Sequence, residues 1–247
     1  MIMKPSWKEK WDDFVFALGE RGYTCDFCGR EAFSYPTPRV CDECEAKQTK
    51  NDKNTCDKCG CMTVTAGVCM RCKTALPAFE RGASPLVYFD ETARQINRFK
   101  RGAKYLARYF ALKALPVLQA LTKDCEEYLL VPVPLTKERQ RERGYNQAEE
   151  LAKLLSRYTG APCASEMLVK TKDGAQQKTL SAQERQKAIV GSYRVHERKR
   201  CEGKTLVLVD DVMTTATTGS ECARVLYNAG AKRVLFLAIA SVPERAR

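Results

Sequence analysis

The run VLVDDVMTTATTGS, residues 207–220, decides how this chain is interpreted. An apolar start, two adjacent carboxylates and a turn rich in hydroxyls are typical of a buried strand that leads into a helix. Asp210 and Asp211 can accept hydrogen bonds from two neighbouring ribose hydroxyls, while the turn's amides and the helix N-terminus attract a phosphate. Further donors come from Thr214, Thr215, Thr217 and Thr218. The run predicts a sugar-phosphate site, and the alternative is a capped helix with solvated threonines.

The sequence around this run alternates strand and helix signals. Short apolar stretches at 128–134 (YLLVPVP), 205–211 (TLVLVDD) and 234–240 (VLFLAIA) are typical of buried parallel strands. The stretch NQAEELAKLLSRYTG has apolar residues at helical spacing, with Asn146 placed to cap the helix and Gly160 to end it. A second amphipathic helix should precede the 234–240 strand. We therefore expect an α/β fold with a mainly parallel sheet.

The cysteines divide the chain into two parts. Nine of the 13 lie between Cys25 and Cys72, and the other four are scattered through the rest of the sequence. The segment KTALPAFERGASP after Cys72 has the Pro and Gly content of a linker. We expect a small cysteine-rich module over residues 1–80 and the α/β domain over residues 81–247.

Four CxxC pairs close together predict metal binding. Zinc prefers four thiolates in a tetrahedron, and short CxxC turns from separate segments provide them. A disulfide framework would need an oxidising compartment, and the first residues of the chain do not read as a secretory signal. Because protein thiolates would fill every position, we expect structural zinc. The predicted ligands are Cys25, Cys28, Cys41, Cys44, Cys56, Cys59, Cys69 and Cys72.

A repeat indicates how these ligands divide between two ions. CDFCG at 25–29 and CDKCG at 56–60 are near copies, and each is followed by another CxxC pair. If each copy forms one zinc ribbon, the first four ligands hold one ion and the last four hold the second. Interleaved pairing is the alternative. Cys61 is left over, either as a packing residue or as a ligand.

The chain is strongly basic, with a net charge of +12, which favours phosphorylated ligands, nucleic acid or an anionic membrane face. A solvated basic surface is the alternative. Because His196 is the single histidine, Ser-His or Cys-His catalysis and histidine-bound metals are not expected. No apolar run approaches the roughly 20 residues of a membrane-spanning helix. We expect no membrane insertion and a cytoplasmic location.

The motifs resemble those of a known family. The strand, acids and TTGAT-like turn of 207–220 look like the phosphoribosyl pyrophosphate (PRPP) loop of type I phosphoribosyltransferases. The stretch VPVPLTKERQRERGYNQAEELA at 131–152 is similar to the VPVPL…R…RGFNQ…LA stretch of ComF competence proteins. INRFKRGAKYLA at 96–107 resembles the lysine-glycine stretch of that family, and QKTLSAQER at 177–185 resembles its Q-x-x-L-S…R segment. With the zinc module, the resemblance covers nearly the whole chain.

The resemblance implies a parallel sheet of the type I phosphoribosyltransferase kind and a role for the acidic run. Asp210 and Asp211 would hold the ribose of PRPP, which binds together with Mg²⁺. The turn of Thr214, Thr215, Ala216, Thr217 and Thr218 would hold the 5′-phosphate. The sequence departs from the family at Ala216, where glycine is usual, and at Thr217.

The resemblance also implies two further loops around the ligand. Residues 135–144 would surround the pyrophosphate, with Lys137, Arg139 and Arg143 as cations. Arg143 would thus join Asp210 and Asp211 as a catalytic candidate. The segment of roughly 170–190 would form a mobile lid, in which Ala188 stands where the family often has asparagine.

Two classes of function follow from this resemblance. The first is Mg²⁺-dependent phosphoribosyl transfer, which needs positioning and electrostatics more than a nucleophile. The second is an adaptor without catalysis in natural transformation and DNA uptake, which would bind single-stranded DNA or other proteins, such as a competence helicase. A ribose-phosphate pocket is compatible with both.

Overall fold

The computed structural model describes residues 24–31, 39–171, 189 and 191–244. The chain forms two compact units, Met1–Lys47 and Gln48–Arg247, and each is described by itself. Residues 48–80, which the sequence assigned to the cysteine-rich module, belong by their contacts to the same unit as the sheet. The second cysteine group is therefore part of the larger unit.

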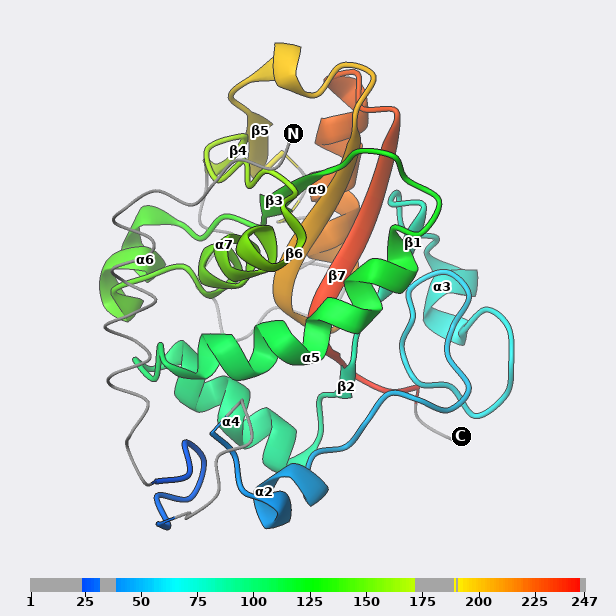
Figure 1. The fold of residues 1–247 in the computed structure, drawn as a ribbon. Helices are drawn as coiled ribbons and strands as arrows, with labels where there is room; N and C mark the ends of the chain where they lie inside the picture. Colours follow the sequence, from blue (N-terminus) through cyan, green and yellow to red (C-terminus); the bar gives the residue numbers. More distant parts are fainter. Residues whose placement is uncertain (1–23, 32–38, 172–188, 190, 245–247) are drawn as a thin grey trace. The chain divides into compact units, whose positions relative to one another are not determined.

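A parallel sheet forms the centre of the larger unit (Figure 1). Its strands lie in the order β1-β7-β6-β3, and β2 also pairs with β7. The strands are β1 (Arg81–Ala83), β2 (Leu86–Val87), β3 (Leu129–Pro132), β6 (Thr205–Met213) and β7 (Arg233–Ser241). All of these pairings are parallel, so the carboxyl ends of β6 and β7 meet at one edge. The three strands expected from the apolar runs are confirmed.

Helices cover both faces of the sheet, so the central strand β7 is buried on both sides. Helices α5 (Leu106–Leu121) and α7 (Gln147–Thr159) pack on one face, and α9 (Thr217–Asn228) packs on the other (Figure 1). The predicted ends of α7 are confirmed: the Asn146 side chain accepts a hydrogen bond from the Ala148 amide at 3.1 Å, and Gly160 adopts φ 77°.

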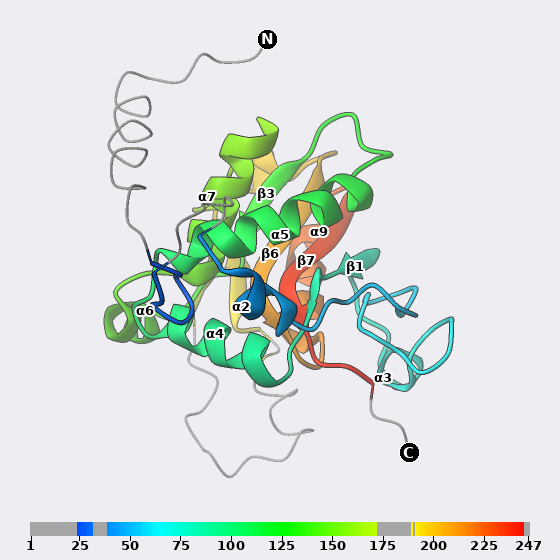
Figure 2. The same cartoon turned by 60° about the horizontal axis from the view of Figure 1, so that its bottom comes forward.

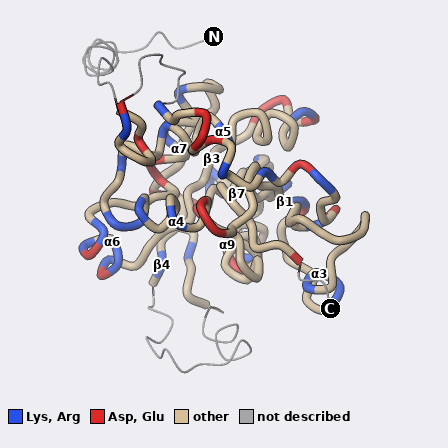
Figure 3. Tube along the Cα trace, turned by 90° about the horizontal axis from the view of Figure 1, so that it is seen from below, with Lys and Arg blue, Asp and Glu red and all other residues tan. Residues whose placement is uncertain are grey.

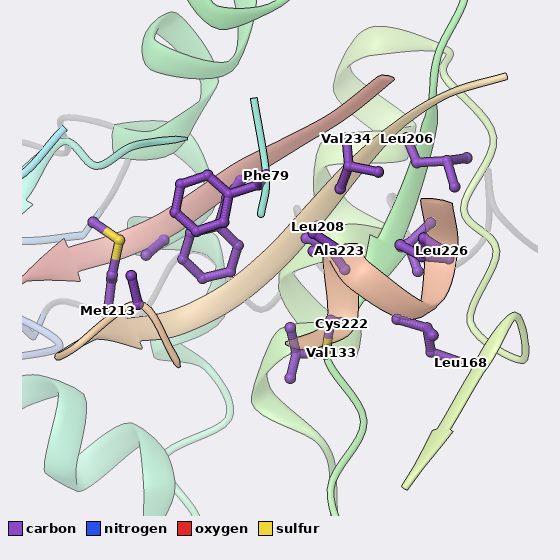
Figure 4. Close-up of a cluster of buried hydrophobic side chains, with 14 of the residues drawn as sticks. Phe79, Val133, Leu168, Leu206, Leu208, Met213, Cys222, Ala223, Leu226 and Val234 are labelled. Atoms are coloured by element: carbon purple, nitrogen blue, oxygen red, sulfur yellow. The ribbon is translucent and has the colours of Figure 1, made fainter. Parts of the chain in front are cut away.

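The core on the α9 face joins the sheet to residues that precede it in the chain (Figure 4). Phe79 stacks on Phe236 of β7, with ring centroids 5.2 Å apart. Cys222 of α9 is completely buried in the same cluster. Helix α9 approaches β7 closely at Gly219, where an added Cβ would lie 2.9 Å from the Phe236 ring. Glycine at this position therefore lets the helix N-terminus sit against the sheet.

Short elements surround the carboxyl edge of the sheet. They are α4 (Asp90–Lys100), α6 (Lys137–Arg143) and the antiparallel pair β4 (Leu168–Lys170) and β5 (Tyr193–Val195). The single turn η1 (Arg198–Arg200) lies at the opposite edge, where Arg198 donates to the Asn228 carbonyl at the end of α9. The carboxyl end of α4 lies beside the segment that joins α6 to α7 (Figure 2), where the Tyr145 hydroxyl donates to the Phe99 carbonyl. None of the described helices is long and apolar enough to cross a membrane.

The resemblance implied that the segment 135–144 is a loop, and the structure differs. It contains helix α6, because the Thr136 hydroxyl caps the helix by accepting from the Arg139 amide at 3.3 Å. Gly144 then ends the helix with φ 77°. Between these two signals, KERQRER consists of good helix formers. Most of the expected lid, including Ala188 and the stretch QKTLSAQER, lies outside the described residues.

Candidate functional site

The first four predicted ligands converge in the smaller unit. The sulfur atoms of Cys25, Cys28, Cys41 and Cys44 all lie within 4.8 Å of one another. Helix α2 (Asp42–Ala46) begins directly after Cys41 and carries Cys44. The backbone amides of Phe27 and Cys41 donate to the Cys25 sulfur at 3.4 and 3.3 Å. Although burial opposes ionisation, the amides of Cys41, Cys28 and Phe27 lower the pKa of Cys25 to about 7, which suits a metal-binding thiolate.

The second four ligands form a matching group in the larger unit. The sulfur atoms of Cys56, Cys59, Cys69 and Cys72 also lie within 4.8 Å of one another. Helix α3 (Met70–Thr74) begins directly after Cys69, and the amides of Cys59 and Cys69 donate to the Cys56 sulfur at 3.4 and 3.3 Å. The repeat in the sequence is thus a repeat in structure, and the two groups are sequential rather than interleaved. Each tetrad could hold a metal ion, since four thiolates complete a tetrahedral set.

Cys61 lies beside the second tetrad without belonging to it. It is fully buried, and the neighbouring Cys59 and Arg71 side chains lower the pKa of its thiol to about 6, although burial opposes this. This placement favours a packing residue over a ligand for Cys61.

The acids of the 207–220 run stand at the carboxyl end of β6, as expected. A carboxylate oxygen of Asp211 lies 3.2 Å from the ammonium of Lys100, the last residue of α4. The Asp210 carboxylate accepts a hydrogen bond from the Asp211 amide at 2.8 Å. Burial, followed by the negative charge of Asp211, raises the pKa of Asp210 to about 7, against the lowering effects of the Asp211 amide, Lys100 and Lys170. Asp210 is therefore held partly in its protonated form near neutral pH.

The threonine-rich turn joins β6 to α9 through a left-handed residue. Ala216 caps α9 with φ 60° and ψ 2°, a conformation that costs a residue with a Cβ about 1–2 kcal/mol. The alanine therefore keeps the backbone shape that glycine, usual in the family, adopts without cost. The Thr215 and Thr217 hydroxyls hydrogen bond with each other at 2.8 Å. The turn presents hydroxyls and a helix N-terminus at the edge where Asp210 stands.

The expected cations lie on α6, where Lys and Arg gather (Figure 3). Lys137 and Arg139 are exposed, and Arg143 donates to the Gln147 side chain at 2.8 Å. Arg139 also acts electrostatically on Tyr193. The structure thus places the α6 cations on a solvent-facing helix, and it is Lys100 that meets the acids directly.

Sequence reasoning did not single out Lys100 or Tyr193 as site residues. Lys100 lies in the stretch 96–107 that resembles the family's lysine-glycine segment, so that resemblance was the available signal. Tyr193 lies on β5, where burial, followed by the effects of the neighbouring Cys222 and Asp210, raises the pKa of its hydroxyl. The ammonium of Lys170 lies 5.4 Å from the centre of the Tyr193 ring. The β4–β5 pair therefore forms one wall beside the acids.

A parallel sheet with paired acids at a strand end, followed by a threonine-rich turn into a helix, is a fold of the phosphoribosyltransferase type. The family model "Phosphoribosyl transferase domain" matches residues 141–247. Among solved structures, the glutamine PRPP amidotransferase from B. subtilis is 21% identical with a TM-score of 0.35, over 52% of this chain and 26% of that chain. The PRPP synthetase from Mycobacterium smegmatis is 20% identical with a TM-score of 0.30, over 54% and 33%.

Relatives in sequence extend over most of the chain. The "DNA utilization protein YhgH" of Escherichia coli K12 is 30% identical over 200 residues, 79% of this chain and 87% of the relative. "Competence protein ComFC" of Bacillus subtilis is 28% identical over 202 residues, 79% and 80%. "Competence protein F" of Haemophilus influenzae is 28% identical over 202 residues, 79% and 87%. The chain belongs to the ComF family.

Proposed function

We propose that this ComF-family protein works in DNA uptake and binds PRPP or a related ribose phosphate, together with Mg²⁺, at the carboxyl end of β6. The observation that carries the proposal is the placement of Asp210 and Asp211 directly before a left-handed turn that caps a helix of 12 residues. Acids accept from ribose hydroxyls, and a helix N-terminus favours a phosphate. The names of the relatives, competence and DNA utilization proteins, support the cellular context.

The residues around the acids support distinct roles. Asp211 is paired with Lys100, so Asp210 is the acid that an incoming cation or ribose hydroxyl would draw into the ionised state. Carboxylate and phosphate oxygens are the ligands that Mg²⁺ prefers, and it enters such sites on the substrate's phosphates. The turn of residues 214–218 would hold the 5′-phosphate.

The α6 helix supplies the remaining charge for a pyrophosphate. Lys137, Arg139 and Arg143 stand on a short exposed helix, and guanidinium groups suit phosphate oxygens because they donate two parallel hydrogen bonds. If the protein transfers the phosphoribosyl group, these cations and Mg²⁺ would stabilise the leaving pyrophosphate, and no protein nucleophile is required. Enzymatic transfer therefore depends on an acceptor that enters beside the ribose.

Zinc is the metal we propose for both cysteine tetrads. Each tetrad consists of four thiolates, and backbone amides donate to one of its sulfurs, as is usual for structural zinc sites. Such an ion has no open position for substrate, so its contribution is to folding.

Calorimetric titration of the zinc-loaded protein with PRPP and Mg²⁺ tests the proposed ligand. Binding should disappear in the Asp210→Asn, Asp211→Asn double variant, because amides accept from ribose hydroxyls less well and do not attract Mg²⁺. A Glu126→Gln, Glu127→Gln variant is a matched control, since these acids are exposed at the amino end of β3, opposite the carboxyl ends of the strands. Absence of binding in folded wild-type protein would refute the proposal.

The second candidate function is a DNA-binding adaptor without catalysis. It is favoured by the net charge of +12 and by the four basic residues of α6. Affinity for single-stranded DNA should then fall steeply with salt, and neutralising Lys137, Arg139, Arg141 and Arg143 should reduce the salt dependence. DNA affinity that is equal at low and high salt would contradict this function. The adaptor would then be tested for binding to a protein, such as a competence helicase.

A further inference from the structure

The guanidinium of Arg71 connects the second cysteine tetrad to the proposed phosphate loop. Its Nη1 atom donates to the Thr214 carbonyl at 2.6 Å, and its Nη2 atom donates to the Val242 carbonyl at 2.5 Å. Thr214 is the first residue after β6, and Val242 is the first after β7. One side chain therefore holds the backbone at the ends of the two central strands, where the acids and the threonine turn begin.

The position of Arg71 is set by the tetrad. Arg71 lies between Cys69 and Cys72 on α3, a helix of five residues that begins at the Cys69 cap. So short a helix is not stable alone, and closure of the sulfur cluster fixes its orientation. Arg71 is itself half-buried, and its guanidinium interacts electrostatically with Cys61 beside the tetrad. A change in the tetrad would thus move the guanidinium.

The segment of residues 56–72 that carries the second tetrad, here called the knuckle, is also joined to the sheet. Gly60 approaches β1 so closely that an added Cβ would lie 2.4 Å from the Gly82 carbonyl oxygen. The Gly82 amide donates to the Lys58 carbonyl at 2.9 Å. The Glu244 carboxylate accepts from the Met70 amide at 2.7 Å, and the Glu244 amide donates to the Met62 carbonyl at 2.8 Å. The knuckle is therefore a rigid support from which Arg71 reaches the loop.

The loop needs such support because it contains a strained residue. Ala216 holds a left-handed conformation two residues after Thr214. A turn that stores strain persists only where neighbouring groups fix its ends. Arg71 fixes the end at Thr214, and the Ser220 hydroxyl, which accepts from the Ala78 amide at 2.9 Å, fixes the start of α9.

We propose that Arg71 is a positioning residue that couples metal binding at the second tetrad to ligand binding in the loop of residues 214–218. An ion in the tetrad orders α3, Arg71 then orders the Thr214 backbone, and the loop binds a ribose phosphate without a further cost of ordering. By reciprocity, a ligand in the loop should tighten metal binding by the same factor. The choice of ligand rests on the function proposed above, whereas the ordering of the loop by Arg71 does not.

The first test compares Arg71→Gln with Lys73→Gln, which removes a positive charge from the same helix at an exposed position. Both zinc-loaded proteins are examined by hydrogen exchange without ligand and by calorimetry with PRPP and Mg²⁺. Arg71→Gln should speed exchange selectively in residues 213–218 and weaken PRPP binding by about 10-fold, within the roughly 5- to 150-fold range of such couplings. Lys73→Gln should leave both unchanged.

The second test measures the coupling itself. Competition with a zinc chelator should show that PRPP tightens zinc binding in wild-type protein and that this effect is lost in Arg71→Gln. Arg71→Lys keeps the charge but has one nitrogen in place of the two that bond the Thr214 and Val242 carbonyls, so it should retain part of the coupling. If Arg71→Gln does not hold its zinc, the Arg71→Lys protein decides the question by the same measurements.

The outcomes separate this inference from the proposed function. Unchanged loop exchange and unchanged PRPP affinity in a zinc-loaded Arg71 variant would overturn the inference. Wild-type protein that fails to bind PRPP would overturn the proposed ligand, and the exchange comparison would still show whether Arg71 orders the loop.

Discussion

The ammonium of Lys100 lies 3.2 Å from a carboxylate oxygen of Asp211 at the end of β6. This ion pair joins the last residue of α4 to the strand that carries both acids. Beside this pair, burial and the negative charge of Asp211 raise the pKa of Asp210 to about 7. The pair therefore sets the charge of the site before any ligand arrives.

Loss of the Lys100 charge should raise the pKa of Asp210 further. Lys100→Gln removes a cation that favours the ionised form, so the carboxyl group of Asp210 should titrate at higher pH. Carbon-detected NMR titration of labelled aspartate measures this shift. Lys104→Gln is the control, because Lys104 pairs with Glu150 at 3.0 Å instead. An Asp210 titration that is the same in the Lys100 variant and in wild-type protein would contradict the assigned pairing.

Replacement of Asp210 should stabilise the fold at high pH. Its pKa in the folded protein is raised to about 7 from the ordinary value of 3.8, so the folded state binds a proton more tightly than the unfolded state. Stability from this group is full below pH 4 and is lost as the pH rises to 7, at about 1.4 kcal/mol per unit at most. Denaturant unfolding should show Asp210→Asn gaining more over wild type at pH 8 than at pH 5. An equal gain at both values would show that the raised pKa is wrong.

Glycine at position 216 should relieve the turn. Ala216→Gly removes the left-handed penalty of about 1–2 kcal/mol but adds chain entropy to the unfolded state, so a net gain of up to about 1 kcal/mol is expected. Thermal unfolding measures the change. Ala120→Gly, at an exposed position in the last turn of α5, is the control and should lose at most about 0.5–1 kcal/mol. Destabilisation by both changes would contradict the left-handed conformation of Ala216.

Cys61 and Cys72 should differ in their effect on zinc content. Cys72→Ser removes a member of the tetrad, so the protein should retain one zinc ion instead of two and should unfold more easily. Cys61→Ser changes a residue beside the tetrad and should keep both ions. Elemental analysis of the purified proteins gives the stoichiometry. Loss of an ion from the Cys61 variant would make Cys61 a ligand.

Local signals in the sequence predicted the elements that depend on local chemistry. The apolar runs became β3, β6 and β7, and the Asn146 cap and Gly160 bound α7 as expected. The cap at Thr136 was an equally local signal, but the resemblance to a pyrophosphate loop concealed α6. The CxxC repeat predicted both tetrads because zinc ligands follow simple spacing rules.

Contacts between distant parts of the chain could not be predicted in the same way. Strands β1 and β2 have only three and two residues, and each exists because β7, far along the chain, offers a partner. The sequence does not distinguish Arg71 from the other basic residues, and only the fold places it against Thr214. Lys100 meets Asp211 for the same reason. Residues of this kind acquire their roles from the tertiary structure alone.

The stacking of Phe79 on Phe236 bears on where the protein can be cut. A fragment that begins at residue 81 would leave one face of the Phe236 ring, now fully buried, open to water. It would also lose the knuckle whose backbone packs against β1 at Gly82. The sheet and the second cysteine group thus belong to one compact unit, and a stable truncation of this protein should retain the chain from residue 48 onward.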